Sequence, residues 1–252
     1  MIITVANQKG GQSKSTTAQA LVSGATARGI KALAIDLDAQ ANLTFSMSGN
    51  LNAPGSYDLI TGKYAAADLI QHTAQGDLIA ASTQLASADT MLTGNDRVFA
   101  VNDAIKSIKR RYKLIVIDTP PTLGTMLLNA LATSDTVIIP ITVDIWSLQG
   151  LYLLTDTIKQ AQSKYNKRLD ISGVLFTKYS ARTVLDRDFA DVIKEKCKSW
   201  QVPVLRTTIR SGVAVREAQL QRESLFTYAP KSKPAQDYSK LLDELKITNK
   251  ER

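Results

Sequence analysis

The sequence predicts an α/β fold with a mainly parallel, twisted sheet and helices on both faces. Three observations carry this prediction. Short apolar runs recur along the chain, helical spacing of apolar residues follows most of them, and acidic residues come directly after two of them. Strands that alternate with helices form right-handed βαβ units. At 252 residues and 44% hydrophobic content, with no linker or charge block, residues 1–252 are expected to form a single domain.

The first strand is expected at residues 2–6, and a Gly-Gly turn and a helix from about Lys14 follow it. Gly10 and Gly11 let the backbone turn tightly and approach an anion, so that N–H groups and the helix N-terminus point at phosphates. In such a loop Lys14 reaches the β- and γ-phosphates, and the Ser15 hydroxyl ligates Mg²⁺. Strand, loop and helix together predict a P-loop NTPase fold.

The loop departs from the common pattern G-x-x-x-x-G-K-[ST], because Gln8 and Ser13 stand at its two glycine positions. It fits the deviant Walker A form Lys-Gly-Gly-x-x-Lys-[Ser/Thr], in which Lys9 precedes the glycines. Here the chain resembles the ParA/Soj family of partition ATPases, whose usual loop is Asn-Gln-Lys-Gly-Gly-Val-Gly-Lys-Thr-Thr. The resemblance implies that Lys9 crosses a dimer interface to the partner's nucleotide.

The resemblance also implies ATP and Mg²⁺ as the ligands of this loop. The expected nucleotide-binding residues are Lys9, Gly10, Gly11, Gln12, Ser13, Lys14, Ser15 and Thr16. Ser13 replaces a glycine of the family, and its Cβ would crowd the β-phosphate or demand a φ that serine tolerates poorly. We expect nucleotide binding, with weak hydrolysis in the absence of partner and DNA. A nucleotide-binding, DNA-binding protein with little turnover is the alternative that Ser13 leaves open.

A helix that ends at Gly29 precedes the second strand, expected at residues 31–35, and Asp36-Leu37-Asp38-Ala39-Gln40 comes next. Open α/β sheets bind their ligands at the carboxyl ends of the strands. The ParA/Soj family has Asp-x-Asp-x-Gln here, which implies that Asp38 positions or activates the attacking water. Asp38 therefore joins Lys9 and Lys14 as an expected catalytic residue, and Asp36 is expected to support the Mg²⁺ site from the second coordination shell.

Residues 41–91 carry weaker signals, namely helical segments at 57–61 and 65–71 and a strand at 77–81. A helix is expected at residues 95–111. The apolar run that follows has the length of a buried parallel strand and ends in Asp118-Thr119-Pro120-Pro121. An aspartate at this position is what a Walker B site needs to hold Mg²⁺, either directly or through a water. The same Asp-x-Pro-Pro sequence occurs in the ParA/Soj family, where it leads into a loop that senses the γ-phosphate.

The rest of the chain predicts strands at 136–141 and 171–177 and helices at 147–164, 186–200 and 236–245. Trp146 and Cys197 are interpreted as packing residues, and His72 as a surface histidine. One cysteine excludes an internal disulfide and a cluster of Cys ligands. A carrier of the nitrogenase-reductase type, which shares the fold but needs cluster cysteines, is thereby excluded.

The net charge of +8 is concentrated near the C-terminus, where residues 178–252 hold 16 Lys/Arg against 10 Asp/Glu. Such clustering suits a polyanion, although a solvated face has the same composition. The segment Thr177-Lys178-Tyr179-Ser180-Ala181-Arg182-Thr183 resembles a family loop whose arginine contacts DNA, which implies that role for Arg182. A weaker match over residues 207–218 carries it approximately to Arg210 and Arg216.

The function that the resemblance implies is an ATP-dependent partitioning ATPase. It would dimerise on ATP, bind non-specific DNA as a dimer, and be released when a ParB-type partner stimulates hydrolysis. We expect a cytoplasmic, nucleoid-associated protein, since no apolar run is long enough to span a membrane. The alternative of a membrane-associated MinD-type ATPase requires a basic amphipathic C-terminal helix, whereas residues 241–252 mix in acidic residues and lack aromatics. A small-molecule kinase stays open, without a recognisable motif for an acceptor.

Overall fold

The computed structural model describes residues 1–87, 95–144 and 147–249, so that Trp146 lies outside the described residues. Eight strands form one sheet in the order β3-β4-β2-β5-β1-β6-β7-β8. All neighbouring strands are parallel except β3, which pairs antiparallel with β4. The expected α/β fold with a mainly parallel sheet is confirmed.

The strands are β1 (Ile2–Val5), β2 (Ala32–Asp36), β3 (Ile70–Thr73), β4 (Gly76–Ile79), β5 (Leu114–Asp118), β6 (Thr136–Thr142), β7 (Asp170–Tyr179) and β8 (Ile209–Arg210). The α-helices are α1 (Lys14–Ala27), α2 (Asn42–Ser46), α3 (Ser56–Thr61), α5 (Ala100–Ile105), α6 (Thr125–Thr133), α7 (Ser147–Lys164), α8 (Val184–Trp200), α9 (Val213–Leu220), α10 (Leu225–Tyr228) and α11 (Lys233–Glu244). Short 3₁₀ segments are η1 (Ala66–Leu69), η2 (Thr83–Ser87), η3 (Asn95–Phe99) and η4 (Lys109–Arg111).

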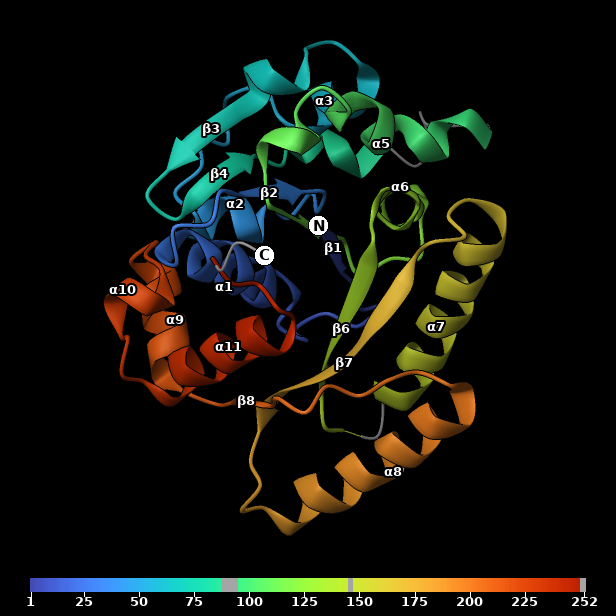
Figure 1. The fold of residues 1–252 in the computed structure, drawn as a ribbon, viewed down its shortest axis with the longest axis vertical. Coiled ribbons are helices and arrows are strands. Elements are labelled where there is room, and N and C mark those ends of the chain that lie inside the picture. Colours follow the sequence, from blue (N-terminus) through green and yellow to red (C-terminus); the bar gives the residue numbers. More distant parts are fainter. Residues whose placement is uncertain (88–94, 145–146, 250–252) are drawn as a thin grey trace.

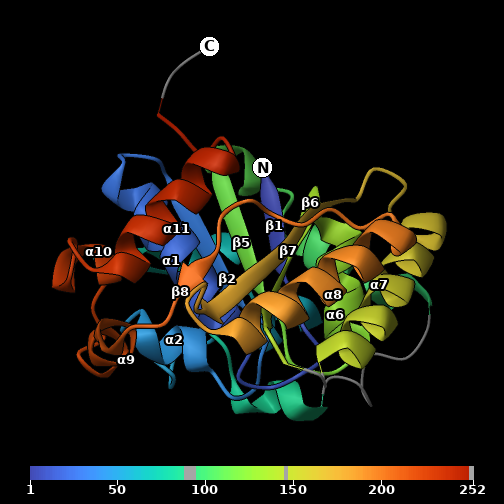
Figure 2. The ribbon, with the colours of Figure 1, turned by 90° about the horizontal axis from the view of Figure 1, so that it is seen from below.

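Helices cover both faces of the sheet (Figures 1 and 2). One core cluster joins α1, α10 and α11 to one face, and two further clusters join α3, α5, α6, α7 and α8 to the other. The central strands β2 and β5 are therefore buried along their whole length. Burial on both faces explains why these strands read as continuous apolar runs in the sequence.

Helix α1 lies between the sheet and the C-terminal helices, and ten of its 14 residues are buried. The helix packs tightly at Gly24, where a Cβ would lie 2.5 Å from the side chain of Leu242 on α11 and 2.7 Å from that of Phe226 on α10. A larger residue there would have to displace these side chains. The phosphate loop predicted from the sequence thus ends in a helix that the core holds on both sides.

The single helix expected at residues 95–111 is wrong, because the structure divides this segment into η3, α5 and η4. The side chain of Asn129 on α6 causes one of the breaks. Its Oδ1 accepts from the backbone N of Val101 at 3.1 Å, and its Nδ2 donates to the carbonyl of Arg97 at 2.9 Å. These two backbone groups would bond to each other in a continuous α-helix. A side chain from a distant part of the sequence replaces that bond.

The helix expected at residues 65–71 is correct only as the short 3₁₀ segment η1. Residues from Ile70 onward form β3 instead, a hairpin with β4 that adds an antiparallel edge to the sheet. His72 on this edge is exposed, as expected, and pairs with Asp77 at 2.6 Å. Cys197, also as expected, is fully buried in the core between α8 and the sheet.

Candidate functional site

The loop between β1 and α1 adopts a conformation that exposes its backbone. Gly11 and Ser13 have φ values of 74° and 66°, in the left-handed region that disfavours a residue with a Cβ. A Cβ built on Gly10 or Gly11 would meet nothing within 4 Å, so that open space lies in front of both. Ser13 is the N-cap of α1 but makes no side-chain hydrogen bond to the helix. The loop therefore presents backbone N–H groups and a helix N-terminus to an open space.

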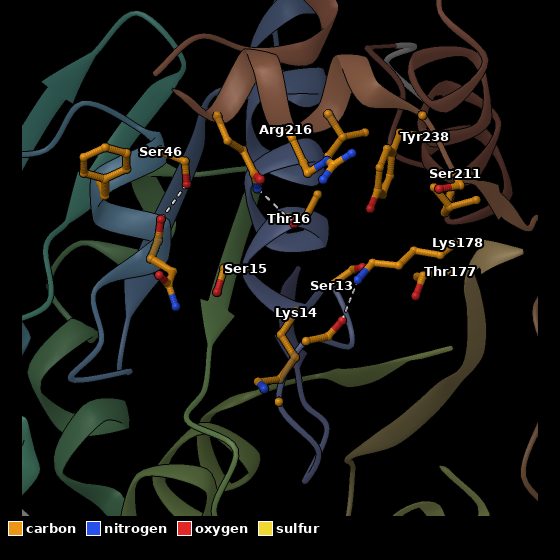
Figure 3. A pocket seen from close by; sticks show the side chains of 18 of the residues that line it. Ser13, Lys14, Ser15, Thr16, Ser46, Thr177, Lys178, Ser211, Arg216 and Tyr238 are labelled. Atoms are coloured by element: carbon orange, nitrogen blue, oxygen red, sulfur yellow. Dashed lines mark hydrogen bonds between the residues drawn. The ribbon is translucent and has the colours of Figure 1, made fainter. Parts of the chain in front are cut away.

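The open space is a cavity of about 1110 Å³ at the carboxyl ends of the strands (Figure 3). Figure 3 shows Ser13, Lys14 and Ser15 at the start of α1, with Thr16 one residue further along the helix. Thr16 Oγ1 accepts a hydrogen bond from Gln219 of α9 at 2.9 Å. The cavity is lined by the loop residues Gly10, Gly11, Ser13, Lys14, Ser15 and Thr16, by Asp38 and Gln40 after β2, and by residues of β7, α9 and α11.

Asp118, at the carboxyl end of β5, is the carboxylate best suited to a cation. It is fully buried, and neither of its oxygens accepts a hydrogen bond of good geometry from the described residues. Burial raises its pKa well above the ordinary value and the charge of Asp36 adds to this, whereas Ser15 and Lys14 act in the opposite direction. Burying this carboxylate is costly even beside Ser15 and Lys14, because burial still outweighs them in its pKa, and a bound cation would offset that cost.

Asp36 and Asp118 lie on neighbouring strands, paired in register. The oxygens of Asp36, unlike those of Asp118, are already occupied. They accept from the backbone N and the hydroxyl of Thr44 at 2.9 and 2.7 Å, and from the backbone N of Asp38 at 3.1 Å. Burial raises the pKa of Asp36 to about 6, against the effect of these hydrogen bonds. Asp36 is thus built into the support of the segment that follows β2.

Lys14 is buried at the centre of this cluster. Burial lowers its pKa, and the charges of Asp118 and Asp38 raise it again. Asp38 lines the cavity, and its Oδ1 accepts from the backbone N of Gln40 at 3.0 Å. The charge of one lysine does not balance two carboxylates. A divalent cation can therefore bind here if an anionic ligand enters with it.

The fit to Mg²⁺ rests on this donor set. Mg²⁺ commonly uses one or two carboxylates together with substrate phosphates and waters. Asp118 and the Ser15 hydroxyl supply such a set, and no cluster of three or more acidic, His or Cys ligands occurs in the described parts of the chain. The residues present therefore suit a magnesium ion that arrives with a nucleotide.

Lys9 and Gln12 point away from the loop and join it to the end of β6. The Lys9 ammonium pairs with both oxygens of Asp144, at 2.8 and 2.9 Å. The Gln12 side chain is buried, and its Oε1 accepts from the backbone N of Thr142 at 2.5 Å. The Thr142 hydroxyl lies 2.9 Å from Gln12 Oε1 and 2.7 Å from Asp144, and its single proton is donated to one of the two. In this single chain Lys9 is held by its own subunit.

The three expected DNA-binding arginines differ in their surroundings. Arg182 is exposed in the loop after β7, and Arg216 is exposed on α9 at the edge of the cavity. Arg210 forms a bidentate pair with the buried Asp237, at 2.8 Å from Nε and 2.6 Å from Nη2. The guanidinium of Arg210 therefore connects β8 to α11, and less of it is available to another ligand.

Sequence reasoning missed Lys178, Asp144 and Asp237. Lys178 and Asp144 follow strands that were expected from the sequence, at the same sheet edge as Asp36 and Asp118. Extending the carboxyl-end rule to every strand would have found both. No local signal marks Asp237, because its role depends on where α11 packs.

The sheet, the loop before α1 and the buried aspartate at the end of β5 define a P-loop NTPase with a deviant Walker A loop. A family model described as an AAA domain matches residues 1–171. The Soj protein of Bacillus subtilis, a sporulation initiation inhibitor, is 34% identical over 250 residues, which are 97% of both chains. The chromosome-partitioning ATPase Soj of Thermus thermophilus is 30% identical over 96% of this chain and 94% of its own. The chain belongs to the Soj/ParA family of partitioning ATPases.

Solved structures agree with the fold. Cobyrinic acid a,c-diamide synthase of Mycobacterium smegmatis, bound to an ATP analogue and magnesium, superposes with a TM-score of 0.85 and 29% identity over 97% of this chain and 93% of that one. A plasmid partition protein of Borrelia burgdorferi gives a TM-score of 0.73 with 24% identity over 97% and 98%, a likeness that supports the fold alone.

Proposed function

We propose that the chain is an ATP-dependent DNA-partitioning ATPase made of one domain over residues 1–252. The observation that carries this proposal is the open loop at the N-terminus of α1, whose Lys14 and Ser15 face the buried carboxylate of Asp118. Homologous structures that hold ATP analogues or ADP with magnesium support ATP and Mg²⁺ as the ligands here.

The places of the residues in the site and, for Asp38, the family resemblance support the following roles. The backbone of the loop and Lys14 bind the phosphates, while Ser15 and Asp118 hold Mg²⁺ and Asp36 keeps the segment after β2 in place. The metal ion neutralises charge on the phosphates as the γ-phosphate leaves. Asp38, which lines the cavity, orients the attacking water.

Lys9, which pairs with Asp144 in the single chain, has a different role in the proposed dimer. In the ATP-bound dimer Lys9 leaves Asp144 and reaches the nucleotide of the other subunit. The two subunits together then offer Arg182 and Arg216 from both halves to non-specific DNA, with a smaller contribution from Arg210. Such binding weakens steeply with salt, because counterion release drives it. A ParB-type protein stimulates hydrolysis and thereby releases the dimer from DNA. The protein acts on the nucleoid, in the cytoplasm.

The membrane-associated alternative finds less support. No helix in the described part of the chain is long and apolar enough to cross a membrane. A MinD-type protein instead needs an apolar face that is free at the C-terminal helix. The apolar side chains of α11 and of the segment after it, Leu241, Leu242 and Ile247, are buried in the core. Vesicle sedimentation with ATP tests this alternative.

The proposal is tested by DNA binding in the presence of ADP or a slowly hydrolysed ATP analogue, together with ATP turnover with and without DNA. We expect DNA binding only with the analogue, its loss in Lys14→Ala and Arg182→Ala, and slow turnover with retained DNA binding in Asp38→Ala. Arg168→Ala is the matched control, because Arg168 is exposed at the opposite edge of the sheet, next to the start of β7. Equal DNA binding with ADP and with the analogue would contradict the proposal that ATP controls DNA binding. ATP binding without turnover under any condition would favour the alternative that Ser13 raises.

A further inference from the structure

Lys178 occupies an irregular position at the end of β7. The register of β7 against β8 shifts between Thr177 and Tyr179, so that Lys178 is the extra residue of a bulge. Its φ of 55° lies in the left-handed region, which a residue with a long side chain rarely adopts. Bulges next to active sites turn a side chain in a new direction. Here the bulge turns Lys178 across the mouth of the cavity.

The Lys178 side chain reaches the phosphate loop. Its Nζ donates a hydrogen bond to the carbonyl of Gly11 at 3.0 Å, and Figure 3 shows the side chain extended from the end of β7 toward the loop. Lys178 lines the same cavity as Gly10, Ser13 and Lys14. Two segments that are far apart in the sequence thus meet over the space proposed for the phosphates.

The charge of Lys178 is not neutralised in this structure. None of the ion pairs among the described residues involves it, and its only partner there is the neutral carbonyl of Gly11. The two lysines of the phosphate loop differ from Lys178, because Lys9 pairs with Asp144 and Lys14 faces buried carboxylates. The ammonium is charged in both bonds, but a phosphate oxygen carries a formal negative charge and the Gly11 carbonyl only a partial one, so the Coulomb attraction to phosphate is larger. An anion in the cavity would therefore attract Lys178 more strongly than the carbonyl does.

We propose that Lys178 binds a phosphate of the bound nucleotide, as a further cation of the site beside Lys14. This inference rests on the proposed ATP binding. On binding, Nζ moves from the Gly11 carbonyl to a phosphate oxygen, a short displacement since both lie at the loop. The unfavourable φ of Lys178 is then the local cost of placing its ammonium over the phosphates. Rare backbone conformations often occur at functional sites for such a reason.

The test compares Lys178→Met, which keeps the unbranched apolar stem and loses the ammonium, with Lys178→Arg, which keeps the charge. The matched control is Lys164→Met, an exposed lysine in the last turn of α7 that does not line the cavity. Titration calorimetry and competition with a fluorescent nucleotide give the affinities for ATP, ADP, tripolyphosphate and adenosine. Thermal unfolding without ligand shows whether each variant keeps its fold.

We expect Lys178→Met to weaken ATP, ADP and tripolyphosphate by about tenfold, the size of one hydrogen bond to a charged group. Adenosine binding should not change, and Lys178→Arg and Lys164→Met should resemble the wild type. Wild-type affinity for tripolyphosphate in Lys178→Met would overturn the inference, and so would an equal loss of adenosine, which indicates a structural role. If the wild type itself does not bind ATP, the proposed function fails first, and the two failures are thereby distinguished.

Discussion

Ser13→Gly is the substitution whose effect follows most directly from the geometry of the loop. At φ 66° and ψ 27° Ser13 is in the left-handed region, which costs a residue with a Cβ about 1–2 kcal/mol. Its side chain makes no cap hydrogen bond that the substitution would remove. Glycine pays roughly 0.5–1 kcal/mol of extra backbone entropy on folding. The difference predicts a gain in the free energy of unfolding of about 0.5–1 kcal/mol.

For a chain of 252 residues a gain of this size raises Tm by about 1–4 °C. Differential scanning calorimetry without nucleotide measures it. Ser13→Ala keeps the Cβ and should show no gain, while Gln201→Gly, at φ 59° after α8 and far from the cavity, should show a similar one. Since only Ser13→Gly removes a Cβ from the loop, it alone should also raise the rate of ATP hydrolysis. An unchanged or lower Tm in Ser13→Gly would refute the reasoning from backbone strain.

Three further predictions concern the charges around the site. Burial raises the pKa of Asp36 to about 6, so the folded state holds a proton that the unfolded state releases, and the wild type loses stability as the pH rises from about 4 to 6. In urea unfolding, the free energy of unfolding of the wild type minus that of Asp36→Asn should therefore fall by up to about 3 kcal/mol over this range. Arg210→Ala leaves the buried Asp237 without its cation, so we expect a loss of about 2 kcal/mol in the same assay, and Arg210→Lys should restore part of it. Burial raises the pKa of Asp144, but hydrogen bonds from Lys9 and Thr142 hold it below the ordinary value. Asp144→Asn should release Lys9 and lower the dissociation constant of the ATP-bound dimer about fivefold in sedimentation velocity. An unchanged constant would contradict the proposed crossing of Lys9 to the other subunit.

The parts of the fold that the sequence predicts well are those that local patterns determine. The long helix at residues 147–164 has the bounds that its apolar spacing predicts, and β5 coincides with an apolar run that ends at Asp118. The segment at residues 95–111 failed for the opposite reason. Its spacing is helical throughout, but Asn129, a residue of another helix, takes over two of its backbone groups. No property of the segment itself reveals this.

The candidate site shows the same division. The loop and the aspartates at the ends of β2 and β5 are consecutive motifs, which a single sequence displays. Three contacts join distant segments, namely the bidentate pair of Arg210 with Asp237, the hydrogen bond from the backbone N of Thr142 to Gln12, and the hydrogen bond from Lys178 to the carbonyl of Gly11. They depend on packing and on a bulge that sequence periodicity does not encode. The strain at Ser13 lies between these cases, since the substitution for glycine is visible in the sequence and the φ value is not.

The burial of α1 on both sides has a consequence for how ligand binding is detected by hydrogen exchange. Amides of a central helix exchange mainly when the whole molecule opens, whereas those of exposed loops exchange by local fluctuation. A ligand at the N-terminus of α1 stabilises the folded state by mass action, in proportion to the logarithm of its concentration over Kd. The slowest amides, deep in α1 and in β5, should therefore report occupancy of a loop that they do not touch, while the exposed loop around Arg182 would exchange at nearly the same rate with and without the ligand.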